Sequence, residues 1–230
     1  MENQTNVIKK KRDVFRICNF VFASVLAAMC LAMMFYYISI GDPNGRVLAC
    51  AISTIPFFAP FLIELIINRR FGNFTILIYL VFVFYSAFMG SVLGLFKTSS
   101  ILDKIAHTVF GYLGCYLGLA LSVNTIGKKD HPWFVLLVCF FTSMAFAALW
   151  EVFEFSGDTF FSQTAQGYPV NGITDVTDTM LDITVNFAGA IVFVIQYVLH
   201  ILTKKNLFIE TMAKDLTLKP RRIKTRVEKE

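Results

Sequence analysis

The chain has 230 residues, of which 56% are hydrophobic and 16% are charged, and its formal net charge is +5. Soluble domains carry about a quarter charged residues, whereas this chain has a mean hydropathy of +0.63. Its apolar residues also fall in long runs, so the composition excludes a soluble enzyme and indicates a protein that lies in lipid. One membrane domain accounts for nearly the whole chain and leaves no room for a separate soluble catalytic domain.

The apolar runs predict an all-α, polytopic membrane helix bundle of about six transmembrane helices, spanning residues 14–202. A basic N-terminus, residues 1–13, precedes the bundle, and a polar, basic tail, residues 203–230, follows it. The site-bearing part covers residues 97–195. The predicted helices are, in chain order, 14–40, 46–67, 73–96, 101–124, 133–155 and 175–202.

Two of the predicted helices need a comment. The first, of roughly 27 residues, is too long for the apolar core of a signal peptide, so we expect it to be retained. Pro56 and Pro60 predict a kink in the second, because each removes a backbone hydrogen-bond donor. Glu64 follows on the same face, and we expect it to pair with an arginine near the membrane surface.

The five cysteines are spread over the apolar segments without any CxxC spacing. This pattern argues against a disulfide framework and against a thiolate metal site, and it indicates small apolar core residues. They are Cys18, Cys30, Cys50, Cys115 and Cys139.

Lysine and arginine are distributed unevenly between the two sides of the predicted bundle. The side that holds both termini collects 18 of them, and the other side has only Arg46, Lys97 and Lys104. Because short cytoplasmic loops carry the excess of basic residues, we expect both termini in the cytoplasm. The tail, with nine basic and four acidic residues after Thr203, should contact anionic lipid.

Eight ionisable residues lie where membrane segments rarely tolerate them, since an isolated charge in hydrocarbon costs about 3 kcal/mol on insertion scales. The fourth helix starts outside, the fifth ends outside and the sixth starts outside, which places all eight at the extracytoplasmic end. We expect them to converge on one polar site. They are Asp103, His107, Glu151, Glu154, Asp158, Asp175, Asp178 and Asp182.

Residue spacing favours this convergence, because polar helix faces turn inward in membranes. Asp103 and His107 are four residues apart, and Glu151 and Glu154 are three apart, so each pair lies on one side of its helix. Small residues that allow close helix contact continue the His107 face, namely Gly111, Gly114 and Gly118. The sixth helix has one polar face with steps of three or four residues, made of Asp175, Asp178, Asp182, Asn186 and Gly189.

Helix capping offers a simpler explanation for part of the cluster. Ser100–Asp103 and Thr179–Asp182 both fit the capping-box pattern, and acids near helix N-termini are stabilised by the dipole. Capping does not explain Glu151 and Glu154 at a helix C-terminus, nor the continuation of the polar face to Asn186. A shared functional site accounts for more of the pattern.

So many carboxylates cannot all stay charged side by side without protons or a bound cation. Oxygen ligands with one imidazole suit Mg²⁺, Ca²⁺ or Mn²⁺, and the imidazole also admits Zn²⁺ or iron. A bound divalent cation can hold a phosphate, as in recognition or hydrolysis of a membrane lipid or a lipid-linked envelope precursor. The expected metal ligands are Asp103, His107, Glu151, Glu154, Asp175, Asp178 and Asp182, supported by Asn186 and Asp158.

Whether the protein is an enzyme stays open at this point. If it is, His107, Glu151 and Glu154 are the candidate catalytic residues. The loop Ser156–Thr174 is long enough to cover the site as a lid.

The same residues resemble a known family pattern. Asp103-Lys104-x-x-His107, Glu151 and Asp182-x-x-x-Asn186-x-x-Gly189 are similar to VanZ-like membrane proteins, a family associated with teicoplanin resistance. The fuller set, Trp150-Glu151-x-x-Glu154 with Asp175-x-x-Asp178-Thr179-x-x-Asp182, more closely resembles the YjdF-like bacterial inner-membrane proteins. This resemblance covers residues 97–195 and implies a multi-pass protein of the bacterial cytoplasmic membrane. It implies no particular reaction.

Two alternatives to a cation and lipid site remain. In a transporter the acids would form a relay, but polar groups should then continue inward, and the inner halves of the last three helices are almost without charge. In a structural or partner-binding protein the acids would be caps and helix contacts only. Nucleic-acid binding is not indicated, because the basic residues lack an aromatic platform. The oligomeric state is not indicated either.

Overall fold

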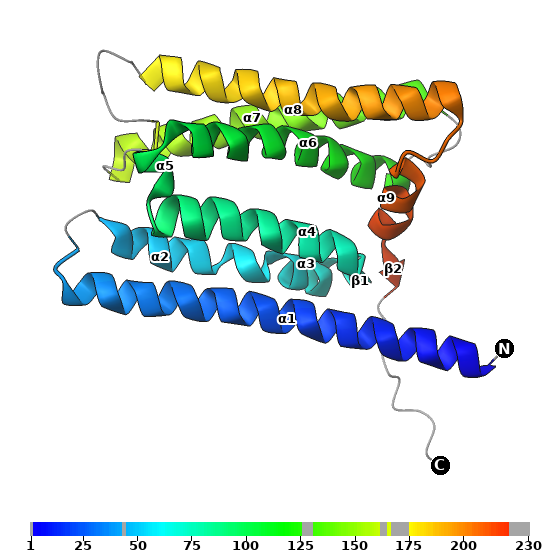
Figure 1. Ribbon diagram of the computed structural model, residues 1–230, viewed down its shortest axis with the longest axis horizontal. Helices are drawn as coiled ribbons and strands as arrows, with labels where there is room; N and C mark the ends of the chain where they lie inside the picture. The colour runs from blue at the N-terminus through cyan, green and yellow to red at the C-terminus, as the bar shows by residue number, and fades with distance from the viewer. Residues whose placement is uncertain (1, 43–44, 126–130, 162–164, 167–174, 221–230) are drawn as a thin grey trace.

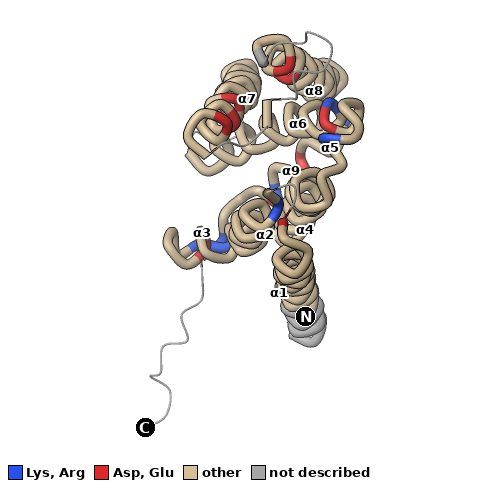
Figure 2. The backbone as a smooth tube through the Cα atoms, turned by 90° about the vertical axis from the view of Figure 1, so that its left-hand side faces the viewer, with Lys and Arg blue, Asp and Glu red and all other residues tan. Residues whose placement is uncertain are grey.

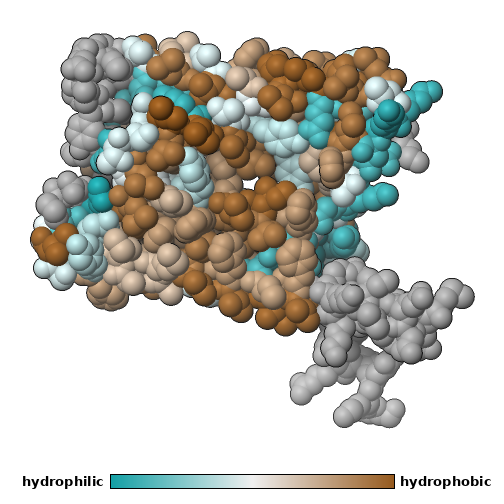
Figure 3. Space-filling model, in the orientation of Figure 1, coloured by the Kyte–Doolittle hydropathy of each residue, from teal (hydrophilic) through white to brown (hydrophobic). Residues whose placement is uncertain are grey.

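The computed structural model describes residues 2–42, 45–125, 131–161, 165–166 and 175–220. Six of its helices are long and apolar enough to cross a membrane, which confirms the predicted all-α membrane bundle. Large apolar side chains cover much of the outside, as expected of a surface that faces lipid (Figure 3). The candidate spans are Val14–Ser39, Arg46–Ile67, Asn73–Val92, Ser100–Thr125, Pro132–Phe161 and Val176–Thr203.

The bundle consists of two halves, each with three membrane segments and its own apolar core (Figures 1 and 2). Phe57 and Leu80 are fully buried in the first core, and Leu119 and Phe193 in the second. The first half comprises α1 (Glu2–Ser39), α2 (Arg46–Thr54), η1 (Pro56–Phe58), α3 (Ala59–Ile67), α4 (Asn73–Val83) and η2 (Phe84–Val92). The second comprises α6 (Ser100–Thr125), α7 (Pro132–Phe161) and α8 (Asp175–Thr203), and the short α5 (Leu95–Thr98) joins the halves.

The predicted kink in the second membrane segment is present. The α-helix ends at Thr54, a 3₁₀ turn begins at Pro56, and a second α-helix follows. The Tyr79 hydroxyl donates to the Pro56 carbonyl at 2.9 Å, and Thr54 Oγ1 donates to the carbonyl of Cys50 at 3.0 Å. Side chains thus satisfy carbonyls at the break, as a membrane interior requires.

Three helix boundaries differ from the sequence prediction. The first helix begins at Glu2 and includes the basic N-terminus, and the fifth membrane helix continues to Phe161 instead of ending near residue 155. The third segment was expected to reach residue 96 but passes into the π-helical η2 and stops at Val92. Gly94 follows with φ of 72°, a left-handed conformation that ends the helix.

Glycines bring α6 into close contact with both of its neighbours, as their spacing predicted. A Cβ on Gly111 would overlap the backbone oxygen of Asn186, and one on Gly189 would overlap the backbone oxygen of Thr108. Gly118 lies in the same way against Cys139 of α7. Because the backbones nearly touch, the rotations and heights of α6, α7 and α8 are closely fixed.

The segment after α8 contains a helix that the sequence analysis did not predict, α9 (Ile209–Leu216). It lies at the end of the bundle where α6 ends and bridges the two halves (Figure 1). Asp215 Oδ2 accepts hydrogen bonds from the Thr75 backbone nitrogen and hydroxyl, both at 2.7 Å, and so caps α4. Asn124 bonds the Leu216 carbonyl at 3.0 Å. Beyond α9, the strand β2 (Lys219–Pro220) pairs antiparallel with β1 (Arg69–Arg70).

Glu64 has the arginine partner that was expected, and the partner is Arg16 of α1. The other carboxylate oxygen accepts from the Phe71 backbone nitrogen at 2.7 Å. Arg16 also lies over the Phe61 ring, 5.9 Å from its centroid. This partly buried pair ties the first two membrane segments together near the end that carries α9.

Candidate functional site

The acidic residues of the second half gather at the end of the bundle where α6 and α8 begin and α7 ends, which we call the cluster end. Figure 2 looks onto this end and shows acidic positions on all three helices. The acidic cluster, as used below, consists of Asp103, Lys104 and His107 of α6, Glu151 of α7, and Asp178 and Asp182 of α8.

Lys104 is the centre of the hydrogen bonding in the cluster. Its ammonium donates to Asp178 Oδ1 and Asp182 Oδ1, both at 2.7 Å, and to Asp103 Oδ2 at 3.0 Å. Three donors on one ammonium therefore meet three carboxylates from two helices. The bonds are charge-assisted and connect α6 to α8 at the cluster end.

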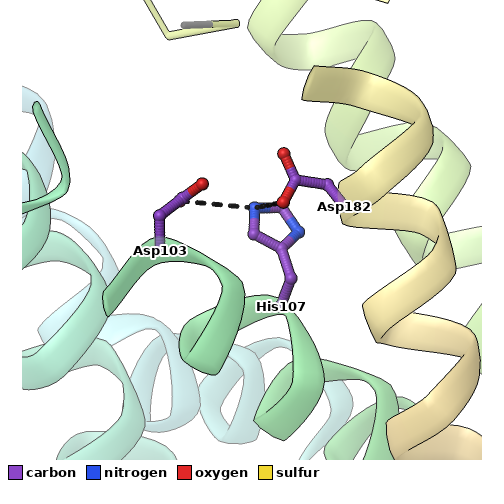
Figure 4. Close-up of side chains that lie close together, drawn as sticks. All are labelled: Asp103, His107 and Asp182. Atoms are coloured by element: carbon purple, nitrogen blue, oxygen red, sulfur yellow. Dashed lines mark ion pairs between the residues drawn. The ribbon is translucent and has the colours of Figure 1, made fainter. Parts of the chain in front are cut away.

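His107 lies beneath this group with both ring nitrogens facing carboxylates. Nε2 is 3.6 Å from Asp182 Oδ1 and 3.7 Å from Asp103 Oδ1, and Nδ1 is 3.9 Å from Glu151 Oε1. Figure 4 shows the Asp103 and Asp182 carboxylates approaching the ring from α6 and α8. The imidazole is thus the point where the three helices meet.

The deep part of the cluster is buried, and its upper part is open. Asp182 is 1% exposed and Glu151 is 6% exposed, whereas the side chains of Asp103, Lys104 and Asp178 are each 18–19% exposed. Entry is therefore from the cluster end.

Two buried oxygen atoms next to the cluster lack hydrogen-bond partners among the described residues. They are Oε2 of Glu151 and Oδ1 of Asn186, which lies one turn beyond Asp182 on α8. Leaving such atoms unpaired costs about 1–3 kcal/mol each. A buried carboxylate oxygen without a donor indicates room for a proton or a cation.

The charges of the cluster do not balance internally. It contains four carboxylates and one ammonium, so three negative charges remain if all the acids are ionised and His107 is neutral. Partly buried like charges repel strongly at the low effective dielectric of a protein interior. The geometry therefore favours the uptake of positive charge.

Other residues predicted from the sequence are placed differently. Glu154 accepts a hydrogen bond from Trp150 Nε1 at 2.7 Å, and a role for it in the cluster stays a prediction. Asp158 accepts from the backbone nitrogens of Ala165 and Gln166 at 2.7 and 2.9 Å, so its side chain holds these two residues instead of joining the cluster. The side chain of Asp175 and most of the expected lid lie outside the described residues.

Lys104 is the member that the sequence analysis did not include among the site residues. It entered there only as one of three basic residues on its side of the bundle and as part of the Asp103-Lys104-x-x-His107 pattern. Its position next to Asp103 gives no sign of the contact with α8, because that contact depends on how closely Gly111 and Gly189 let the helices approach. The sequence did contain one indication of this role, because Lys104 is a single lysine at a membrane-helix end whose other charged residues are acidic.

Three of the residues could hold a metal ion. One ligand atom each from Asp103, His107 and Asp182 lies within 4.8 Å of the others. Two oxygens on opposite sides of a Ca²⁺ ion are themselves about 4.8 Å apart, because each Ca–O distance is about 2.4 Å. Small side-chain movements would therefore close the set around one ion, with Glu151 alongside. Lys104 competes for the same carboxylates.

Comparison with known proteins identifies a family but no activity. Among the curated proteins none matches the chain, and neither does any solved structure. The family described as "Predicted membrane protein (DUF2238)" matches residues 21–203, more than three quarters of the chain. The match begins within α1 and ends with α8, so it takes in all six membrane segments and every residue of the acidic cluster. The chain belongs to this family of multi-pass membrane proteins.

Proposed function

We propose that this protein binds one divalent cation in the acidic cluster. The observation that carries the proposal is the approach of Asp103, His107 and Asp182 ligand atoms to within 4.8 Å of one another. Glu151 Oε2 supports it independently, because this buried oxygen has no hydrogen-bond partner in the described part of the chain and could serve as a further ligand. Carboxylates with one imidazole suit Mn²⁺, Mg²⁺ or Ca²⁺, and they also suit Zn²⁺.

Cation binding has to displace Lys104 from Asp182. The Asp182 Oδ1 atom lies 3.6 Å from His107 Nε2, and the same atom accepts the Lys104 hydrogen bond at 2.7 Å. A metal ion at this oxygen would repel the ammonium. Lys104 keeps Asp103 and Asp178 as partners nearer the opening, so its displacement does not leave it without a counter-charge.

A site of this kind would bind a phosphate group at the membrane surface. A bound cation and the displaced Lys104 ammonium would together offer two positive groups at the cluster end, where the side chains are partly exposed. Phosphate oxygens bind such pairs in many proteins. We infer that the site takes the head group of a membrane lipid or of a lipid-linked envelope precursor.

A transport pathway is less well supported than a site that opens to one end. Directly below the cluster, the backbones of α6 and α8 meet at Gly111 and Gly189 with no room for a Cβ. The membrane-spanning parts of α6, α7 and α8 below the cluster contain no Asp, Glu, Lys or Arg. The buried Ser and Asn side chains there are Ser122, Ser143 and Asn186. Asn186 donates to the Ser143 hydroxyl at 3.4 Å, and Ser122 donates to the Gly118 carbonyl at 2.9 Å.

The resemblance to YjdF-like and VanZ-like proteins supports a place in the bacterial cytoplasmic membrane, and the distribution of basic residues supports an extracytoplasmic cluster end. Reporter fusions test the orientation. A fluorescent protein fused after Glu230 should be fluorescent inside the cell, and alkaline phosphatase fused there should be inactive. The opposite pair of results would show that the cluster end lies on the cytoplasmic side of the membrane.

The cation itself is tested by thermal unfolding of metal-stripped protein in detergent. A ligand that binds only the folded state stabilises it by RT ln(1 + [L]/Kd), so the unfolding temperature rises with the ligand concentration and with its affinity. We expect Mn²⁺ or a related ion to raise it in the wild type and in Glu210→Gln, an exposed acid of α9, but not in Asp182→Asn or His107→Ala. An equal rise in Asp182→Asn would disprove the site.

A further inference from the structure

Between the two halves lies an apolar groove that is separate from the acidic cluster. It has a volume of about 460 Å³, and α4, η2 and α6 form its walls. Figure 3 shows the surface hollowed between the halves. The lining residues are Leu77, Ile78, Val81, Phe82, Tyr85, Ile105, Val109 and Leu113.

The groove faces away from the cluster. Ile105 and Val109 are each two residues from His107, which places them on the opposite side of α6. Both walls belong to candidate membrane spans, Asn73–Val92 and Ser100–Thr125, so the groove lies within the depth that these spans cross. The medium at its open side is therefore lipid hydrocarbon.

Hydrogen bonds between the halves close the groove at both ends. At the cluster end, the Tyr85 hydroxyl donates to the Leu102 carbonyl at 2.8 Å. At the other end, Thr75 Oγ1 and the Tyr116 hydroxyl are 2.9 Å apart. The only polar atom of the lining side chains, the Tyr85 hydroxyl, is thus already hydrogen-bonded. The lining therefore offers no free polar group that would bind a polar occupant.

The length of the groove favours one kind of occupant. From Leu77 to Tyr85 the wall extends about 12 Å at 1.5 Å per residue, and hydrogen bonds between the halves bound it at both ends. A membrane-spanning helix from a second copy of the chain is about 30 Å long, so only about two of its turns could lie in the groove. A flexible hydrocarbon chain follows such a short wall and is supplied by the lipid at the open side.

We propose that the groove holds an acyl chain of a bilayer phospholipid, which forms part of the packing between the two halves. An empty groove would leave its lining atoms without contacts on one side. The halves have separate cores and meet mainly through α5, η2 and α9, so the acyl chain fills the place where α4 and α6 diverge. This site does not depend on the proposed cation.

Photolabelling tests the proposal in proteoliposomes. The probe is a phospholipid with a diazirine midway along one acyl chain, and the labelled residues are mapped by mass spectrometry. We expect the lining residues of the groove to be labelled several-fold more than Val192, Ile195 and Leu199, which form an exposed apolar face of α8. Equal labelling of the two surfaces would mean ordinary boundary lipid and would overturn the proposal.

A matched pair of substitutions fills either the groove or a control surface. Val109→Trp should reduce the groove labelling several-fold, and Val192→Trp should not, although Val109 and Val192 are 42% and 58% exposed. Unchanged labelling in Val109→Trp would contradict an acyl-chain occupant, and so would cross-links between two protein chains at the groove formed by a separate bifunctional reagent. If Val109→Trp does not fold, Leu113→Phe narrows the groove from the same wall and provides the same test. The ratio of groove labelling to control-surface labelling in the wild type tests the proposal without any substitution.

Discussion

Lys104 and Asp182 form a hydrogen-bonded ion pair of 2.7 Å between α6 and α8, and the Asp182 carboxylate is almost completely buried. The lysine is thus the resident positive charge of a site that we expect to bind a divalent cation. Two properties of this pair oppose each other. It stabilises the protein in the absence of a cation, and it competes with the cation when one is present.

The substitution Lys104→Met should separate these two effects. Without divalent ions it should lower the free energy of unfolding by about 3 kcal/mol, because it leaves a buried carboxylate unpaired. With Mn²⁺ present, the affinity should rise about tenfold, since the competing ammonium is gone. Calorimetric titration and thermal unfolding measure both quantities. Lys97→Met is the control at the same end of the bundle, and a fall in affinity in Lys104→Met would show that the lysine helps to bind the ligand.

The contact between α6 and α8 at Gly111 should set the position of the cluster. Gly111→Ala places a methyl group against the Asn186 backbone oxygen, so the helices must separate, at a cost of about 1–3 kcal/mol. The distance between His107 and Asp182 should then increase, and Mn²⁺ should bind more weakly. Ala188→Leu, at an exposed position of α8, is the control. Unchanged stability and affinity in Gly111→Ala would mean that the helices are not fixed by this contact.

Glu64 should matter for stability and not for the site. Glu64→Ala removes the acceptor of Arg16 and of the Phe71 nitrogen, and we expect a loss of about 3 kcal/mol in chemical unfolding. The rise in unfolding temperature on adding Mn²⁺ should be the same as in the wild type. A loss of that cation effect in Glu64→Ala would instead connect this acid with the cluster and revive the transport alternative.

Asp215 caps a helix that lies 140 residues earlier in the chain. Asp215→Ala should cost about 1–2 kcal/mol, the usual effect of losing an N-terminal cap. Gly72→Ala should cost a similar amount, because a Cβ at Gly72 would overlap the Asp215 carboxylate. The two changes remove the same interaction, so the double variant should be little worse than either single one. Additive losses would show that the two residues act independently.

The membrane helices could be predicted from the sequence because hydropathy and length are local properties. Ser100–Thr125 and Asp175–Thr203 differ from their predicted ranges by one residue at most at each end. The continuation of α7 to Phe161 could not be predicted in the same way, because Gly157 and the polar residues around it are typical of a turn. The helix α9 was missed because its apolar residues are few and are buried only by packing across both halves.

The sequence predicted which helix faces carry the site, but it did not predict which side chains contact each other. Spacing along α6 and α8 placed Asp103, His107 and Asp182 on faces that could meet, and the structure brings them together. The partner of each charge depends on side-chain reach across helices, which spacing does not contain. For that reason Lys104 was missed as the central donor. Glu154 lies about 60° around α7 from Glu151, and its partner is Trp150 on the surface.

The most direct test of the cation site is pulsed electron paramagnetic resonance of Mn²⁺ bound to the purified protein. An imidazole ligand produces a ¹⁴N modulation of the Mn²⁺ signal, which water and carboxylate ligands do not. We expect about one bound Mn²⁺ per chain, with ¹⁴N modulation in the wild type and in His131→Ala and none in His107→Ala. Absence of stoichiometric Mn²⁺, or modulation that survives in His107→Ala, would contradict this expectation.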